Sequence, residues 1–107
     1  MINDSEIESA LNYLRDNSTK AAQAKANREY LDEYKKVLKA SIMREHEGLS
    51  LGAQEAIAYS DPRYEQHLKA WKDAVEQDVY FQWMKTAAEA KIEAWRTFSS
   101  NERANRI

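Results

Sequence analysis

The 107-residue chain contains no cysteine, one proline and only two glycines. Without cysteine it can form no disulfide, thiolate metal site or cysteine nucleophile, and its composition is compatible with a reducing compartment. Pro62, Gly48 and Gly52 are too few for the turns of an all-β domain of this size. The composition therefore favours helices, and the length fits one small domain with a modest core.

Long apolar runs are also missing. No stretch approaches the roughly 20 residues that span a bilayer, and the start MINDSEIESA lacks the basic and apolar regions of a signal peptide. The formal net charge is −2, without the dense basic surface of proteins that bind nucleic acid through phosphates alone. We therefore expect a soluble protein of the cytoplasm with no membrane contact.

Two helices are predicted in the first half of the chain. Ser5 and Glu8 form a capping box, and Asp16-Asn17-Ser18 predicts the end of a short helix over 5–16. A second helix over 19–47 should end at Gly48, because glycine at the C′ position adopts positive φ easily. Its predicted packing face consists of Tyr30, Tyr34, Val37 and Leu38.

Two more helices are predicted after Gly48. Ser50 caps a short helix over 51–59, and Asp61 followed by Pro62 predicts the start of a long one over 62–99. The remaining residues, 100–107, are expected to form a polar tail. The predicted fold is all-α, in a single domain over 1–107: an antiparallel helical hairpin of the coiled-coil kind, made of two long helices, with a short N-terminal helix and a short connecting helix.

The segment Val79-Tyr80-Phe81-Gln82-Trp83-Met84 is the most apolar part of the long helix. At about 100° per residue, apolar residues before and after this segment form two stripes on different sides of the helix. We expect a straight helix covered by different neighbours, in preference to a kink near 78–84. The candidate protein interface comprises residues outside both stripes and residues beyond the reach of the second helix, namely Tyr80, Trp83, Ile92, Trp95 and Phe98. The first helix or a second copy of the chain could cover that end, so we expect a homo-oligomer.

Residues for catalysis are scarce. His46 and His67 lack the Glu-x-x-His spacing of carboxylate metal bundles, and no glycine-rich phosphate loop or GxSxG motif occurs. We predict no enzyme, no cofactor and no metal. Arg96, Arg103 and Arg106 are candidate nucleic-acid contacts, with a fraying polar tail as the alternative interpretation.

Several segments resemble a family of small helical proteins of tailed phages and prophages. They are REYLDEYKKVLKASIMRE at 28–45, AQEAIAYSDPRYEQHLKAWKDAVE at 53–76, Trp83, and KIEAWR with Asn101 and Arg103, so that the resemblance covers about 25–106. Members are mostly hypothetical proteins encoded near phage recombination and replication genes. The resemblance implies a bacterial host cytoplasm and a link to phage DNA metabolism.

Three functions are compatible with these observations. The first is a non-enzymatic, self-associating interaction protein that assists phage DNA recombination or replication by binding a protein or single-stranded DNA. The second is a small inhibitor of a host defence or replication enzyme, acting through an acidic face such as Asp73, Glu76 and Asp78. The third is direct binding of single-stranded nucleic acid by the arginine tail.

Overall fold

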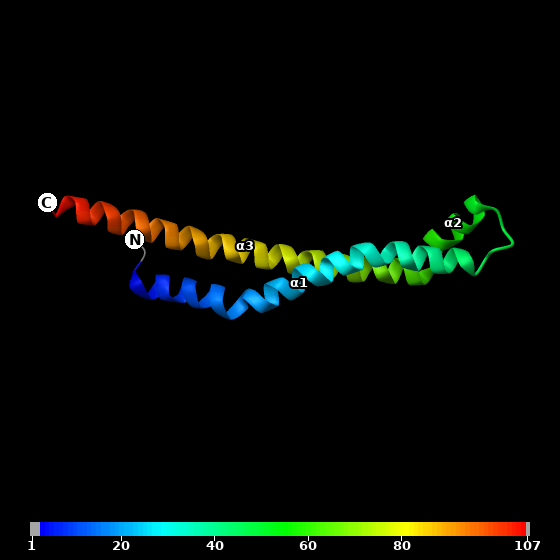
Figure 1. Cartoon of the computed structure of the whole chain (residues 1–107), viewed down its shortest axis with the longest axis horizontal. Helices are drawn as coiled ribbons and strands as arrows, with labels where there is room; N and C mark the ends of the chain where they lie inside the picture. The colour runs from blue at the N-terminus through cyan, green and yellow to red at the C-terminus, as the bar shows by residue number, and fades with distance from the viewer. Residues whose placement is uncertain (1–2, 107) are drawn as a thin grey trace. The chain divides into compact units, whose positions relative to one another are not determined.

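The computed structural model describes residues 3–106, and its regular structure there is entirely helical. The helices are α1 (Asp4–Arg44), α2 (Leu51–Ser60) and α3 (Pro62–Asn105), shown in Figure 1. No strand occurs within this range. The predicted all-α fold class is confirmed, but there are three helices instead of four.

The predicted break at Asp16-Asn17-Ser18 is wrong, because α1 runs through it without interruption. The side chains of Asn17 and Ser18 bond back to the preceding turn instead of capping a new helix. Asn17 Nδ2 donates to the Tyr13 carbonyl at 3.0 Å, and Ser18 Oγ donates to the Arg15 carbonyl at 3.3 Å. These residues are therefore compatible with a helix interior, and the alanine-rich stretch that follows favours helix as well.

The two ends of α1 also differ from the prediction. The Glu6 amide donates to Asn3 Oδ1 at 2.9 Å, so Asn3 caps the helix and Ser5 lies inside it. At the other end α1 stops at Arg44, and the His46 amide bonds to the Met43 carbonyl at 3.0 Å in a tighter turn. Gly48 does not adopt positive φ, because this tight turn ends the helix before the chain reaches it.

The starts of α2 and α3 confirm the prediction. Ser50 Oγ accepts a bond from the Ala53 amide at 3.3 Å, and Asp61 Oδ1 accepts one from the Arg63 amide at 2.8 Å, with Pro62 as the first residue of α3. The expected polar tail is wrong as far as Asn105, because α3 continues to that residue. An ion pair one turn apart, Arg106 to Glu102 at 3.5 Å, supports the extra turns.

Buried positions on α1 and α3 repeat in alternating steps of three and four residues, the repeat of helices that pack in coiled coils. Every buried residue of the two helices belongs to one of these two seams. The α1 seam is Ile7, Ala10, Leu14, Asn17, Ala21, Ala24, Arg28, Leu31, Lys35, Leu38 and Ile42. The α3 seam is Tyr64, His67, Trp71, Ala74, Asp78, Phe81, Lys85, Ala88, Ile92, Trp95 and Ser99, of which Lys85 alone is exposed.

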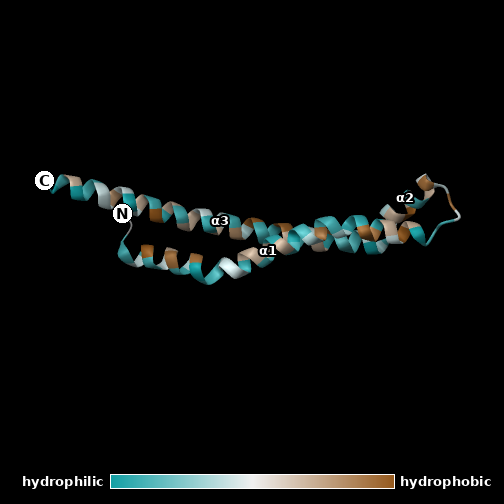
Figure 2. Ribbon diagram, viewed as in Figure 1, coloured by the Kyte–Doolittle hydropathy of each residue, from teal (hydrophilic) through white to brown (hydrophobic). Residues whose placement is uncertain are grey.

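The expected change of face within 79–84 is therefore wrong. The α3 seam passes through this segment without a shift, because polar His67 and Asp78 occupy buried positions that a search for apolar residues leaves out. The predicted packing face of 19–47 is displaced in a similar way, since Tyr30, Tyr34 and Val37 are exposed. Figure 2 shows the corresponding alternation, with short apolar bands separated by hydrophilic ones along each long helix.

The chain comprises two compact units. The central unit is Gln23–Asp78, and the terminal unit combines Met1–Ala22 with Val79–Ile107. Within the central unit, Arg28 of α1 contacts Asp78 of α3, and Glu45, directly after α1, contacts Arg63 at the start of α3. Residues later in the first segment thus contact residues earlier in the second. The single domain predicted over 1–107 stays a prediction.

None of the helices within residues 3–106 is both long enough and apolar enough to cross a membrane.

Candidate interaction surfaces

A buried ion pair joins the two long helices in the central unit. Arg28 Nη1 lies 3.1 Å from Asp78 Oδ2, and the Asp78 side chain is only 3% exposed. Both residues occupy seam positions. A charge at such a position requires its partner opposite, so this pair disfavours any register that separates the two residues.

A second polar contact in this seam involves His67, which is buried although the sequence offers no sign of it. His67 Nε2 lies 2.6 Å from the Leu31 carbonyl oxygen, so this nitrogen carries the proton and donates. The Tyr34 ring stands 5.6 Å from the imidazole. A helix backbone carbonyl thus serves as the partner of the histidine, which has a structural explanation and needs no ligand.

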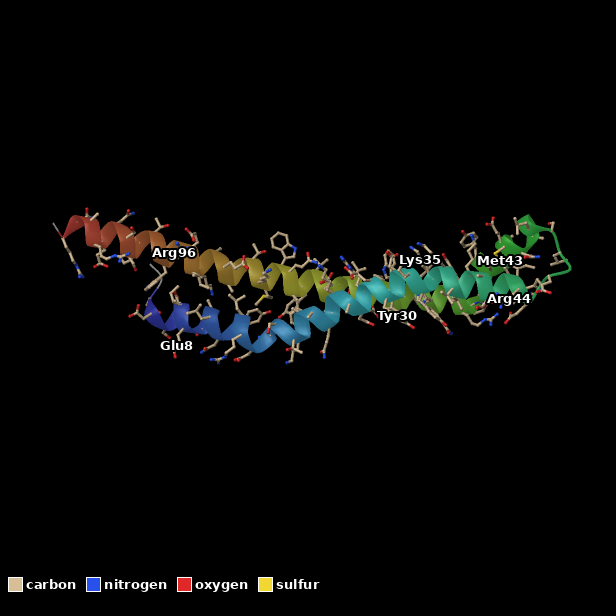
Figure 3. The ribbon with its side chains drawn as sticks, in the orientation of Figure 1. Glu8, Tyr30, Lys35, Met43, Arg44 and Arg96 are labelled. Carbon is tan, nitrogen blue, oxygen red and sulfur yellow. The ribbon has the colours of Figure 1, made fainter. Side chains whose placement is uncertain are left out.

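Lys35 provides the third polar seam contact (Figure 3). Its Nζ lies 2.9 Å from Asp32 Oδ1 and 4.8 Å from the centre of the Trp71 ring, a cation–π geometry. The hydrogen bond between Lys35 and Asp32 lowers the pKa of Asp32 and raises that of Lys35. The Trp71 indole Nε1 is buried with no hydrogen-bond partner among the described residues.

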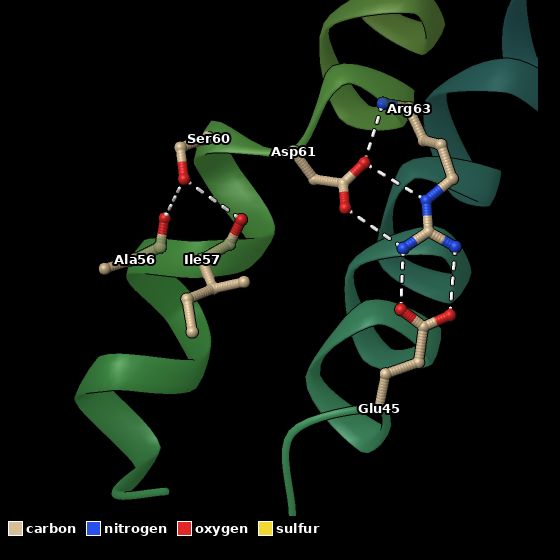
Figure 4. A network of polar contacts seen from close by, with 6 residues as sticks. All are labelled: Glu45, Ala56, Ile57, Ser60, Asp61 and Arg63. Carbon is tan, nitrogen blue, oxygen red and sulfur yellow. Dashed lines mark hydrogen bonds and ion pairs between the residues drawn. The ribbon is translucent and has the colours of Figure 1, made fainter.

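The start of α3 is tied to the end of α1 by Arg63 (Figure 4). Its guanidinium forms two bonds with Glu45, at 3.0 and 2.7 Å, and further bonds with both carboxylate oxygens of Asp61. Hydrogen bonding to Arg63 lowers the pKa of Glu45 and of Asp61, and the two carboxylates raise the pKa of Arg63. This network fixes the connection around α2.

Lys39 attaches α2 to α1. Its Nζ donates to the Tyr59 hydroxyl at 2.8 Å and to Glu55 Oε1 at 3.1 Å. These two bonds, the first the stronger influence, raise the pKa of Lys39. The short helix α2 is therefore held by polar bonds between Lys39 and its own side chains, in addition to the burial of Ala58.

The terminal unit contains a cavity of about 400 Å³ between α1 and α3. Its lining combines apolar and polar residues, namely Tyr13, Leu14, Asn17, Ser18, Ala21, Phe81, Lys85 and Glu89. The Tyr13 hydroxyl oxygen is buried with no hydrogen-bond partner among residues 3–106. Removal of this group from water raises the pKa of Tyr13, and nearby Tyr80 adds a smaller increase.

The five candidate interface residues fall into two groups. Tyr80, Trp83 and Phe98 are exposed, at 55, 70 and 41% of their surface. Ile92 and Trp95 lie on the α3 seam and are half-buried, so they face inward. The structure therefore divides a set that the sequence analysis treated as one surface.

Arg96 and Arg103 lie in the last turns of α3, and Arg106 directly follows its end. Arg96 Nη1 pairs with Glu93 at 3.2 Å and Arg106 Nη2 pairs with Glu102 at 3.5 Å (Figure 3 labels Arg96). Arg96 and Arg103 border a groove of about 620 Å³, lined by residues of α3 alone. Two of the three charges are thus partly balanced within the helix, which weakens the case for a phosphate site.

Residues 3–106 contain no group of three or more histidine, aspartate and glutamate side chains that could hold a metal ion. No family model, curated protein or solved structure matches the chain. The resemblance to a phage and prophage family, and the functions that it implies, therefore stay predictions.

Proposed function

We propose that the chain is a non-enzymatic, self-associating helical interaction protein of phage or prophage origin that assists DNA recombination or replication. The observation that supports self-association is its exposed area. The chain exposes 8029 Å². A compact monomer of 12.4 kDa exposes about 6,100 Å². The excess of roughly 1,900 Å² is more than the ~800 Å² that each partner contributes to an interface of standard size.

The kinds of hydrophobic residue that are buried and exposed also support self-association. Eight hydrophobic residues are buried among those described, and five of them are alanines, which remove little apolar surface from water. Twelve large hydrophobic residues are exposed over the same range. A chain that leaves this many large apolar side chains in water gains stability when another molecule covers them.

In this proposal α1 and α3 form an antiparallel hairpin, and the opposite order of the Arg28–Asp78 and Glu45–Arg63 contacts in the central unit supports it. The hairpin supplies an interaction surface and no reaction. The phage setting and the cytoplasmic location rest on the resemblance over 25–106 alone.

Sedimentation equilibrium on the full chain tests the first part of the proposal. We expect a dimer or higher oligomer at micromolar concentration, and a monomer at all concentrations would refute self-association. The same measurement with a purified phage single-strand annealing protein, and separately with a single-stranded oligonucleotide, tests the DNA-related role. No change in the mass of either mixture would refute that role.

The two other functions predict different results. An enzyme inhibitor would co-purify with a host enzyme and retain no DNA. The acidic face suggested for an inhibitor loses one of its three carboxylates, because Asp78 is buried beside Arg28 and does not reach the surface. A nucleic-acid tail would lose oligonucleotide binding on charge reversal at Arg103 and Arg106.

A further inference from the structure

The α3 helix carries a second stripe of residues in the terminal unit, next to its seam. It consists of Tyr80, Met84, Ala87, Lys91, Ala94 and Phe98, again in alternating steps of four and three residues. Tyr80 and Phe98 are exposed at the two ends, Met84 is half-buried, and the three residues between Met84 and Phe98 are exposed. Trp83, at 70% exposure, borders this stripe beside Tyr80 and Ala87. A helix with two adjacent stripes packs against more than one neighbour.

The order of residues in this second stripe is self-complementary. If two copies of the stripe run antiparallel about a two-fold axis near residue 89, Tyr80 lies opposite Phe98, Met84 opposite Ala94, and Ala87 opposite Lys91. Each large side chain at one end then meets a ring or a small residue of the other copy. The alanines near the axis let the backbones approach closely. Lys91, the one charged residue of the stripe, can lay its aliphatic stem over Ala87 and keep its amine in water.

We propose that a second copy of this chain covers the second stripe, with the two α3 helices antiparallel and the two-fold axis near residue 89. This inference rests on the self-association proposed above and names its surface. Two observations support a second copy as the occupant. The exposed area exceeds that of a compact monomer by more than the ~800 Å² that one partner contributes to a standard interface, and the stripe matches itself under the symmetry of a dimer.

Engineered disulfides test this arrangement directly, because the chain has no cysteine of its own. We would prepare two full-length variants, Met84→Cys and Ala94→Cys, and oxidise each alone and in an equimolar mixture. In the proposed dimer the two positions face each other across the interface. Two copies of the same position are about 15 Å apart along the axis, too far for a disulfide. We expect at least ten times more cross-linked dimer in the mixture than in either variant alone.

Gln82→Cys and Arg96→Cys form a matched control pair. They too are placed symmetrically about residue 89, each about seven residues from it where Met84 and Ala94 are about five, but each is turned about 200° around the helix from its counterpart in the second stripe. Both are exposed, so their thiols are equally accessible. We expect no cross-link from this pair, alone or mixed.

A second measurement uses substitutions in place of a cross-link. Trp83 and Leu51 are each 70% exposed, on α3 and α2 respectively. We expect Trp83→Ser to raise the dimer dissociation constant at least tenfold, and Leu51→Ser to leave it within twofold. Because both side chains lie in solvent in the single chain, neither change should prevent folding.

The outcomes separate the inference from the proposed function. A dimer by sedimentation that cross-links through 82 and 96, or that shows equal effects for the two serine variants, overturns the surface and leaves self-association intact. Cross-linking of Met84→Cys with itself indicates parallel helices and overturns the antiparallel arrangement. A strict monomer overturns both.

Discussion

Arg28 and Asp78 meet between α1 and α3, with Arg28 Nη1 3.1 Å from Asp78 Oδ2, at seam positions of both helices. The carboxylate is buried, and the guanidinium side chain retains 32% of its exposure. Removal of charged groups from water costs free energy that the pair recovers only while both members are present. The pair therefore contributes more to the choice of register than to net stability.

Removal of one member should destabilise the chain strongly. We expect Asp78→Asn to lower the free energy of unfolding by about 3 kcal/mol, because it leaves the Arg28 charge without its compensating carboxylate. Urea unfolding followed by circular dichroism measures this change. The matched control is Glu76→Gln, which removes a carboxylate from the exposed pair with Lys72 at 4.0 Å and should have a much smaller effect.

Replacement of both Arg28 and Asp78 tests whether the pair contributes to net stability or mainly to the choice of register. The double variant Arg28→Met with Asp78→Leu should be close to the parent in stability or above it, because apolar side chains fill the same space without the desolvation cost. A double variant as unstable as Asp78→Asn would contradict this account of the pair.

Proline at position 19 tests the continuity of α1. Thr19→Pro lies inside a helix in the structure, so we expect a loss of about 3 kcal/mol or more in the free energy of unfolding. If a helix began after Ser18, position 19 would be its first residue and would accept proline. Leu51→Pro is the control, because Leu51 is the first residue of α2. An equally small effect of both substitutions would restore the predicted break.

Acid titration tests the Arg63 network. Hydrogen bonds from Arg63 lower the pKa of Glu45 below 4.5 and that of Asp61 below 3.8 in the folded chain. Because these folded pKa values are depressed, the stability that they contribute is present above pH 4.5 and is lost as the pH falls through the lowered values. We expect Arg63→Gln to raise both titration midpoints, as measured by NMR of the carboxyl carbons.

Arg44→Gln serves as the control for this titration, since it removes one positive charge beside Glu45 without touching the network. It should leave both midpoints close to those of the parent. Equal shifts in the two variants would show that general charge, and not the bonds to Arg63, sets the pKa values.

The starts of α2 and α3 are predictable because a local rule decides them. Ser50, Asp61 and Pro62 bond or restrict their own neighbouring backbone, so the starts of α2 and α3 follow from a few residues. The local rule does not decide the outcome at Asn17 and Ser18, because such side chains can either cap a helix or bond back within one. The continuous helix satisfies their polar groups as well as a cap would.

Among the candidate interface residues, Tyr80, Trp83 and Phe98 are exposed, whereas Ile92 and Trp95 are half-buried on the seam. The interface itself stays a prediction. Ile92 and Trp95 were expected beyond the reach of a second helix over 19–47, but α1 is continuous and begins at Asp4. The expected change of face within 79–84 has another cause. Asp78 and His67 keep the seam continuous but are polar, so the apolar residues on either side of 79–84 resemble two separate faces.

The sequence by itself determined that this chain is helical, through its scarcity of glycine and proline and through its caps, because these act on the backbone within one turn. Only the tertiary structure decided which face of each long helix is buried. A histidine or an aspartate enters a seam when another helix supplies its partner, as the Leu31 carbonyl does for His67 and Arg28 does for Asp78. Those partners lie 36 and 50 residues away along the chain, beyond the reach of any local pattern.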